Sequence, residues 1–362
     1  MTLDTLNSIL TKPFQMKITK THTSKLKNVD FDNLQFGRVF SDHMVVCTYT
    51  SGKWNEPEIK EYQPFSLNPA THVFHYGQAI FEGMKAYNSK ENKTLLFRPL
   101  ENIKRLNKSA KRLCMPQIDE SIFMDCLTKL VEIDKKWIPK KENQSLYIRP
   151  FMIATSEFIR ATPADEFTFC IITSPSDKYY AGESNLKIEE KYSRSAPGGV
   201  GFAKAAGNYA AAFGPTKEAQ NNGYTQVVWT DASKHQYIEE SGTMNIMFLI
   251  DNVIITPELS DSILGGITRD SILQIARSKG IKVEERKVSI NEIVEAYDNN
   301  KISEAFGVGT AVTVNPIDSI TFRDKKMEFE YTQNSISIEL KTNLLNIQYG
   351  ISKDENNWML TL

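Results

Sequence analysis

The chain has 362 residues, of which 41% are hydrophobic and 24% are charged, and these proportions are ordinary for a globular protein. At roughly 100–200 residues per domain, this length predicts two domains. The 43 lysines and arginines balance 44 aspartates and glutamates, so no overall positive field exists to hold nucleic acid or an anionic membrane.

Targeting signals and metal-binding patterns are absent from the sequence. The longest apolar run, 244–250, is far shorter than the roughly 20 residues that cross a bilayer. The amino-terminal segment has no apolar signal core, and its first arginine is Arg38, which disfavours a mitochondrial transit peptide. We therefore expect a cytoplasmic protein. The cysteines form no C-x-x-C pair, and His72 and His75 have no neighbouring cysteine or carboxylate cluster, so we expect neither disulfides nor a metal site.

The first half of the chain is expected to mix helices and strands in a small α+β domain over 1–177, after a polar arm over 1–35. Apolar spacing of three and four residues predicts helices, and β-branched, aromatic runs predict strands. The expected elements are helices over 100–113 and 121–137 and strands over 145–155 and 167–173. Asp119 is the expected cap of the second helix. The charged segment 178–195 is expected to be an interdomain linker.

The second half, 196–362, is expected to be a larger, strand-rich domain, which gives the whole chain an α/β fold. The expected elements are strands over 225–230, 247–255 and 281–288 and helices over 268–278 and 334–349, with a further helix beginning at Ser289. Asp251-Asn252 is a two-residue hairpin turn. Ser289 and Glu292 form a capping box.

The segment 196–212, APGGVGFAKAAGNYAAA, places one lysine, Lys204, among glycines and alanines. A lysine is usually a solvated surface residue, and that remains the alternative here. Small flanking side chains, however, would let a flat ligand approach the backbone, and a poorly hydrated lysine has a depressed pKa. A neutral amine can form an imine with an aldehyde, which indicates pyridoxal phosphate.

Three further segments suit the same cofactor. Glu239 and Glu240 are consecutive and would point to opposite faces of a strand, so one of them could face a protonated pyridine nitrogen. The alternative, to which the residues alone give equal weight, is that both carboxylates are solvated at the end of a strand. In LGGITRDS, 264–271, glycines lead into a helix whose free N–H groups could bind phosphate. The turn FGVGTA, 306–311, could bind a carboxylate or phosphate oxygen, or simply reverse the chain.

Five blocks of the sequence resemble the branched-chain amino-acid aminotransferases, of the fold-type IV group of pyridoxal phosphate enzymes, over about residue 36 to the carboxyl terminus. They are FGRVFSDHM (36–44), HYGQAIFEGMKAY (75–87), LFRPLENIKRL (96–106), LYIRP (146–150) and ESGTMN (240–245). The resemblance implies that 196–362 binds the cofactor and that the enzyme is a homodimer.

The resemblance also implies cofactor roles for individual residues. Lys204 would bind the cofactor covalently and, once freed, move the proton between substrate Cα and cofactor C4′. Tyr209 would bond the phenolic oxygen, and Glu240 would pair with the pyridine nitrogen. The phosphate would be held by Arg105, by the backbone N–H groups of Ile267 and Thr268, and by Thr310. The residues by themselves neither choose Glu240 over Glu239 nor single out Arg105.

Substrate contacts are implied in the same way. The residues matching positions around a branched side chain are Phe36, Tyr76, Phe81, Tyr147, Tyr179 and Thr243, though each aromatic would otherwise be read as ordinary core. Arg149 would receive the distal carboxylate of glutamate, and the N–H groups of Thr310 and Ala311 would hold the α-carboxylate. Some animal relatives carry a C-x-x-C redox pair where this chain has Val312 and Asn315. Cys114, nine residues beyond Arg105, is expected to be buried, so we expect no thiol switch.

The implied reaction is ping-pong transamination: leucine, isoleucine or valine gives its amino group to the cofactor, and 2-oxoglutarate then collects it as glutamate. D-amino-acid aminotransferase and aminodeoxychorismate lyase, of the same fold, are the alternatives, but those families lack the FGRVFSDHM and LYIRP blocks. A dinucleotide-binding reading of GGVG fails on its spacing, which is not G-x-G-x-x-G.

Overall fold

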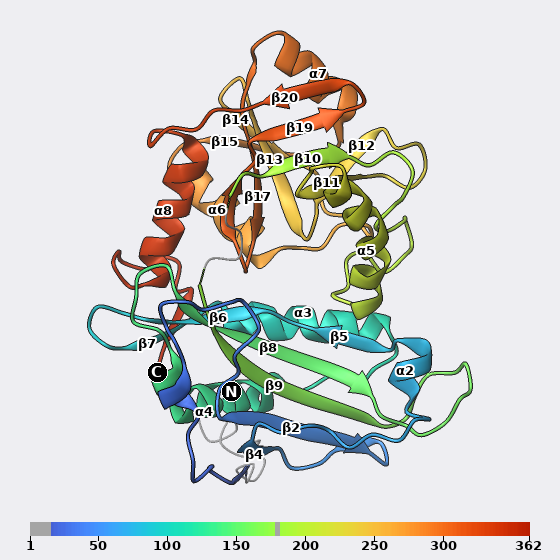
Figure 1. Cartoon of the computed structure of the whole chain (residues 1–362), viewed down its shortest axis with the longest axis vertical. Coiled ribbons are helices and arrows are strands. Elements are labelled where there is room, and N and C mark those ends of the chain that lie inside the picture. The colour runs from blue at the N-terminus through green and yellow to red at the C-terminus, as the bar shows by residue number, and fades with distance from the viewer. Residues whose placement is uncertain (1–15, 178–181) are drawn as a thin grey trace, which may run out of the picture.

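Two β-sheets organise the chain into two lobes, which lie below and above α3 in the view of Figure 1. This computed structural model describes residues 16–177 and 182–362. Within those ranges, one sheet has ten strands and the other eleven, with helices packed around both. The expected α/β fold is confirmed, and no helix in the described ranges has the length and apolar character needed to span a bilayer.

The first sheet has ten strands in the described part of the chain and forms the lower lobe in Figure 1. Its main path is β1 (Lys17–Ile18), β4 (Glu58–Glu61), β2 (His43–Thr50), β9 (Phe167–Ser176), β8 (Ser145–Ala154), β6 (Met84–Asn88), β7 (Thr94–Phe97) and β21 (Met359–Thr361). Off this path, β3 (Lys53–Trp54) pairs with β2, and β5 (Ala79–Phe81) pairs with β8. The antiparallel β8–β9 pair is continuous from Ser145↔Ser176 to Ala154↔Phe167, so it forms a long, rigid floor.

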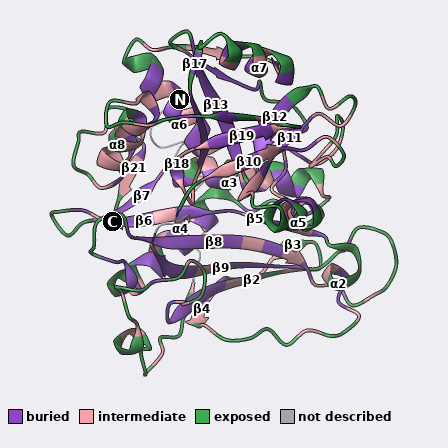
Figure 2. Ribbon diagram, turned by 45° about the horizontal axis from the view of Figure 1, so that its top comes forward, coloured by how far each residue is buried: buried purple, intermediate pink, exposed green. Residues whose placement is uncertain are grey.

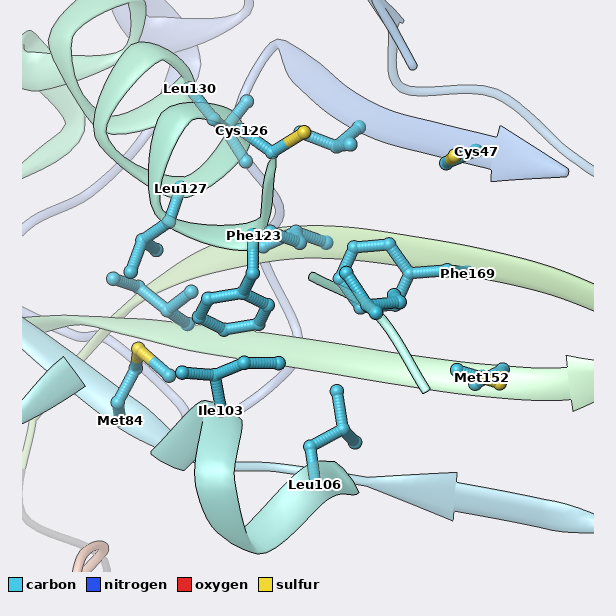
Figure 3. Packing of buried hydrophobic residues seen from close by; sticks show 14 of the residues in the cluster. Cys47, Met84, Ile103, Leu106, Phe123, Cys126, Leu127, Leu130, Met152 and Phe169 are labelled. Carbon is cyan, nitrogen blue, oxygen red and sulfur yellow. The ribbon is translucent and has the colours of Figure 1, made fainter. Parts of the chain in front are cut away.

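Helices α3 (Pro99–Arg112) and α4 (Glu120–Ile133) confirm the two helices expected in the first half, although 135–137 is a separate 3₁₀ turn. Asp119 caps α4, as expected, by accepting from Ser121 N at 2.8 Å. Their apolar faces meet the strands in one core, and Figure 3 shows Ile103 and Leu106 of α3 gathered with Phe123 of α4. A short helix, α2 (His72–Tyr76), lies at the far end of this lobe.

The second sheet is ordered β15 (Lys282–Glu285), β14 (Val253–Thr256), β13 (Met244–Ile250), β12 (Tyr237–Ser241), β11 (Gln226–Thr230), β10 (Asn185–Ile188), β19 (Ser319–Phe322) and β20 (Lys325–Glu328). β16 (Val288–Ser289) pairs with β12, while β17 (Ile302–Gly309) pairs with β13 and with β18 (Thr313–Pro316). The helices are α5 (Ala206–Asn221), α6 (Ile267–Ser278), α7 (Ile290–Asp298) and α8 (Ile336–Gln348).

Local signals in this half are confirmed. Asp251 and Asn252 both have positive φ, 48° and 62°, as a tight hairpin turn requires. Ser289 caps α7 through a 3.0 Å hydrogen bond from Glu292 N, but the Glu292 carboxylate pairs with Arg286 at 2.6 Å, so only half of the expected capping box is formed.

The boundaries expected for the lobes are wrong at two places. Asn185–Ile188, expected to be linker, forms β10, which pairs in parallel with β11 and β19 in the interior of the second sheet. Leu186 and Ile188 are buried there, so the charged flanks concealed a short interior strand. At the other end, β21 returns to the first sheet and pairs with β7, so the carboxyl terminus belongs to the first lobe.

The lobes are held together by a shared apolar cluster. Tyr87, Leu95 and Phe97, from β6 and β7, pack in one cluster with residues of β13, β17, α6 and α8. Figure 2 shows that buried residues follow the strands of both sheets, whereas the outer helices and loops are exposed. The boundary between the lobes is therefore a packed junction, which fixes how side chains from the two sheets face each other.

Candidate active site

A cavity of about 650 Å³ lies at this junction and is lined from both lobes, by β5, β8 and α3 below and by the start of α5, β12, the start of α6 and the β17–β18 turn above. Most residues that the sequence assigned to cofactor or substrate line it. These are Phe36, Phe81, Arg105, Tyr147, Arg149, Lys204, Tyr209, Glu240, Thr243, Ile267, Thr268, Thr310 and Ala311.

Two expected substrate residues are not brought into this cavity. Tyr76 lies outside it at the end of α2, with its ring 4.7 Å from that of His72 and 41% of its surface exposed. The short helix turns this side chain onto its own histidines, so the expectation that Tyr76 lines the pocket is wrong for a single copy of the chain. Tyr179 lies outside the described residues.

Lys204 is held by both lobes just before α5 begins. Its backbone N–H donates to Ser109 Oγ of α3 at 2.9 Å, its carbonyl accepts from Phe81 N of β5 at 3.1 Å, and Ala205 bridges to Ile80. The ammonium lies 2.8 Å from the hydroxyl of Tyr209, one turn along α5, and 4.9 Å from the Phe81 ring centroid. The backbone is thus fixed on three sides while the amine stays in the cavity.

Glu240, on β12, is the carboxylate that faces the cavity. Its Oε2 pairs with Arg194 Nε at 2.8 Å, and its Oε1 accepts from Leu264 N at 2.8 Å. Burial raises the pKa of Glu240, and the Arg194 guanidinium opposes that effect. Arg194 itself is fully engaged, since it also donates to the carbonyl oxygens of Ser262 and Gly201. The side chain is therefore oriented by its partners before any ligand binds.

Glu239 points away from the cavity, as the alternation of a strand requires. Burial raises the pKa of Glu239 to about 7, and its Oε2 has no hydrogen-bond partner among the described residues. Of the two consecutive carboxylates between which the residues alone could not choose, Glu240 is therefore the one that lines the cavity.

Beside the start of α6, the cavity combines a largely buried arginine with helix N–H groups, a combination that suits an anion. Arg105 of α3 makes two hydrogen bonds to Glu82, at 2.7 and 2.8 Å, and donates to the carbonyl oxygen of Gly265 at 2.9 Å. Burial alone would raise the pKa of Glu82, but Arg105 holds that carboxyl below its ordinary value. Next to it, Ile267 and Thr268 begin α6, so their N–H groups have no partner within the helix.

Close packing at this cradle explains one of its two glycines, Gly266. A Cβ on Gly266 would lie 2.0 Å from Asn245 Oδ1, so only glycine fits there. In the GGVG segment, by contrast, a Cβ on Gly201 would lie 2.4 Å from the carbonyl oxygen of Ser262. That glycine does not line the cavity, so its purpose is packing of the chain and not the ligand approach that the sequence suggested.

Arg149 lies at the aromatic wall of the cavity, on β8. Its guanidinium is 4.7 Å from the Phe81 ring centroid and 5.3 Å from that of Tyr147, and it donates to the Tyr147 hydroxyl at 3.0 Å. Its Nε is buried and has no partner among the described residues. Gly83 is required beside it, because a Cβ there would lie 2.2 Å from the Tyr147 hydroxyl. The wall therefore offers both apolar surface and a cation with spare donors.

The sequence did not reveal Glu82 or Arg194, which pair with the cavity-lining residues Arg105 and Glu240. An isolated charged residue is normally taken to be solvated, and the partners of Glu82 and Arg194 lie 23 and 46 residues away along the chain. A further expectation was wrong: Cys114 is exposed, because the chain leaves α3 there in a left-handed conformation with φ of 54°. The other three cysteines are buried, which raises the pKa of Cys47 and of Cys126 to about 12.

Comparison with known proteins agrees with the resemblance to aminotransferases that the sequence motifs indicated. The family model for amino-transferase class IV matches residues 79–320. The chain is 44% identical to branched-chain-amino-acid transaminase 1 of Bacillus subtilis (strain 168), over 91% of this chain and 94% of that protein.

Two solved structures share the fold. One is a branched-chain aminotransferase from Thermoproteus uzoniensis with norvaline, with a TM-score of 0.72 and 24% identity over 88% of this chain and 99% of that one. The other is the branched-chain amino acid aminotransferase from Thermobaculum terrenum in its PLP form, with a TM-score of 0.70 and 21% identity over 88% of this chain and 97% of that one. With a cavity that presents a lysine, a buried carboxylate and an anion cradle, this chain belongs to the class IV aminotransferases, in the family of the branched-chain amino-acid aminotransferases.

Proposed function

We propose that this protein binds pyridoxal 5′-phosphate and transfers amino groups from leucine, isoleucine and valine to 2-oxoglutarate, giving branched 2-oxo acids and glutamate. The observation that carries the proposal is the placement of Lys204 Nζ, 2.8 Å from the Tyr209 hydroxyl, in a cavity that is also lined by Glu240 and by the first residues of α6.

The residues of the cavity fit this cofactor. Glu240, kept in place by Arg194, would hold the pyridine nitrogen, and Tyr209 would hold the phenolic oxygen. Arg105, the N–H groups of Ile267 and Thr268, and Thr310 would hold the phosphate. Pyridoxal phosphate, when bound, supplies an electron sink that stabilises negative charge on the substrate Cα.

Lys204 is the proposed general base. Its amine would take the proton from the substrate Cα and hold it for delivery to C4′ of the cofactor, a contribution typically worth about 10²–10⁴-fold in rate. Tyr209 fixes the amine by accepting its hydrogen bond, and Phe81 covers it, so water has little access to the proton in transit. The backbone hydrogen bonds of this lysine anchor the base of its side chain at the cavity in both halves of the reaction.

One pocket must accept both an apolar side chain and the distal carboxylate of glutamate. Phe36, Phe81, Tyr147 and Thr243 supply the apolar surface. Arg149 supplies charge, and the aromatic faces against it, together with the Tyr147 hydroxyl, shield that charge when the apolar substrate is bound. The α-carboxylate, common to all substrates, would be held by the N–H groups of Thr310 and Ala311.

We further propose that the enzyme is a cytoplasmic homodimer. All four cysteines are free, which suits a reducing compartment. Large apolar side chains such as Phe74, Ile159 and Phe213 are each more than 60% exposed, as expected of a surface that a second copy covers. Light scattering at micromolar concentration tests the dimer, and a mass of 41.1 kDa, that of one chain, would contradict it.

The reaction is tested by incubating the purified protein with pyridoxal phosphate, 2-oxoglutarate and one amino acid at a time, and measuring glutamate. We expect glutamate from L-leucine, L-isoleucine and L-valine. Glutamate from D-alanine with none from L-leucine would favour a D-amino-acid aminotransferase. Pyruvate release from aminodeoxychorismate would favour the lyase of the same fold.

A further inference from the structure

Lys85 connects the first lobe to the backbone of the β17–β18 turn. It lies on β6, within the first sheet, and its Nζ donates to the carbonyl oxygen of Ala311 at 3.0 Å. Ala311 lies 226 residues further along the chain, in the second lobe. Lys85 does not line the main cavity, but lines a smaller one of about 70 Å³ behind the turn. Its charge therefore acts on the far side of the segment that faces the substrate.

The carbonyl that Lys85 binds belongs to a peptide that borders the substrate cavity. Both Ala311 and Val312 line that cavity, and no peptide in the described part of the chain is cis. A trans peptide points its C=O and the following N–H in opposite directions. With the Ala311 oxygen directed at Lys85, the Val312 N–H is directed away from Lys85, so the hydrogen bond fixes the orientation of this peptide. The Lys85 ammonium thus restrains the backbone directly after Thr310 and Ala311, the two residues whose N–H groups would hold the α-carboxylate.

The turn needs such a restraint. Residues 310–312 connect β17 to β18, and Thr313, the first residue of β18, has a φ of 62°. A β-branched residue in this left-handed region is strained, so contacts from outside the turn must select its conformation. The Lys85 hydrogen bond is one such contact, and it comes from the opposite lobe.

We propose that Lys85 is a positioning residue, which holds the β17–β18 turn in the conformation that binds the α-carboxylate common to every substrate. This inference rests on the proposed function, because it takes Thr310 and Ala311 as the α-carboxylate site. It differs from the role proposed for Arg149, which concerns only the second carboxylate of glutamate and 2-oxoglutarate.

The surroundings of Lys85 make the restraint sensitive to pH. Burial, with a smaller effect from Lys341, lowers the pKa of Lys85 to about 8. The other titratable groups around the smaller cavity are Tyr87, Tyr349, Asp177 and Lys341. Burial raises the pKa of both tyrosines, so they stay neutral near pH 8. Between pH 7 and 9 Lys85 loses its proton, and carboxylate binding should weaken as the pH rises.

The test compares Lys85→Met, which keeps the length of the side chain without its charge, with Lys85→Arg, which keeps a charge. The probe is 4-methylpentanoate, which has the carbon skeleton of leucine but no amino group. Its dissociation constant is measured on the cofactor-loaded enzyme at pH 7 and pH 9. Lys85→Met should weaken the probe about tenfold at pH 7, the lower end of the range for a hydrogen bond to a charged group. Lys85→Arg should recover most of that loss.

Two controls separate this role from others. Lys104→Met removes an exposed lysine that lines none of the cavities described above, so it should leave 4-methylpentanoate binding within about twofold. The affinity of each Lys85 variant for pyridoxal phosphate, measured by absorbance titration of the apoprotein, should stay within about threefold of wild type. In wild type the probe should bind more weakly at pH 9 than at pH 7, and Lys85→Met should reduce that difference.

Unchanged probe binding in Lys85→Met would overturn the inference, and so would a parallel tenfold loss of cofactor affinity, which would indicate a general structural role. The proposed function would survive either result if Arg149→Ala still separated leucine from 2-oxoglutarate. If Lys85→Met does not fold, the same comparison is made with Lys85→Arg and wild type, and a wild-type dissociation constant that is equal at pH 7 and 9 overturns the inference.

Discussion

Replacing Arg149 with alanine should separate the two substrates of the reaction. The distal carboxylate of 2-oxoglutarate is expected to take hydrogen bonds from the guanidinium, whose Nε is buried and has no partner among the described residues. A hydrogen bond to a charged group is worth about 1.5–3 kcal/mol, so its loss corresponds to roughly a 10- to 150-fold fall in kcat/KM for 2-oxoglutarate. Leucine makes no such bond, and its kcat/KM should change by less than about threefold.

The two half-reactions are measured separately by stopped-flow absorbance, with leucine on one form of the enzyme and 2-oxoglutarate on the other. Arg149→Lys is the matched control. It keeps the charge but loses the planar fork that lies over the Phe81 and Tyr147 rings, so its loss with 2-oxoglutarate should fall between wild type and alanine. Equal losses with both substrates in Arg149→Ala would refute this reasoning and make the arginine a structural residue of the aromatic wall.

Three further predictions concern the cofactor and the thiols. Glu240→Gln should lower leucine turnover by about 100-fold because the charge that faces the pyridine nitrogen is lost, whereas Glu239→Gln, outside the cavity, should stay within about threefold; the reverse order would contradict the assignment. Gly266→Ala should weaken pyridoxal phosphate binding at least about tenfold, as measured by absorbance titration. Gly265→Ala should change that binding little, because the atom nearest to its added Cβ would lie 3.7 Å away. Leucine transamination should survive mild peroxide even if the exposed Cys114 is oxidised; inactivation that a thiol reductant fully reverses would place a reactive cysteine at the site.

Local patterns in the sequence predicted the elements whose signals are local. The helical spacing of α3 and α4, the hairpin at Asp251 and Asn252 and the cap at Ser289 all depend on residues within a few positions of one another. β10 escaped prediction because four residues between charged flanks carry too little periodicity. Its stability comes from parallel pairing with β11 and with β19, which lies more than 130 residues away.

The site divides in the same way. Lys204 and the glycines before α6 stand out from their immediate neighbours, so the sequence alone pointed to them. Arg105, which lies on a helix among other charges, was identified only by resemblance to the family. Glu82 and Lys85 carried no local signal at all, because their partners lie 23 and 226 residues away and only the fold brings them together.

The central claim is that Lys204 carries the cofactor in the cavity between the lobes, and chemical trapping tests it most directly. The protein loaded with pyridoxal phosphate is reduced with borohydride, digested and mapped by mass spectrometry, with Lys204→Ala treated in parallel. The account predicts a phosphopyridoxyl group on the peptide that contains Lys204, loss of the visible absorbance band on reduction, and no such modification in a folded Lys204→Ala variant. Stoichiometric labelling of another lysine in the wild-type protein, with Lys204 unmodified, would contradict it.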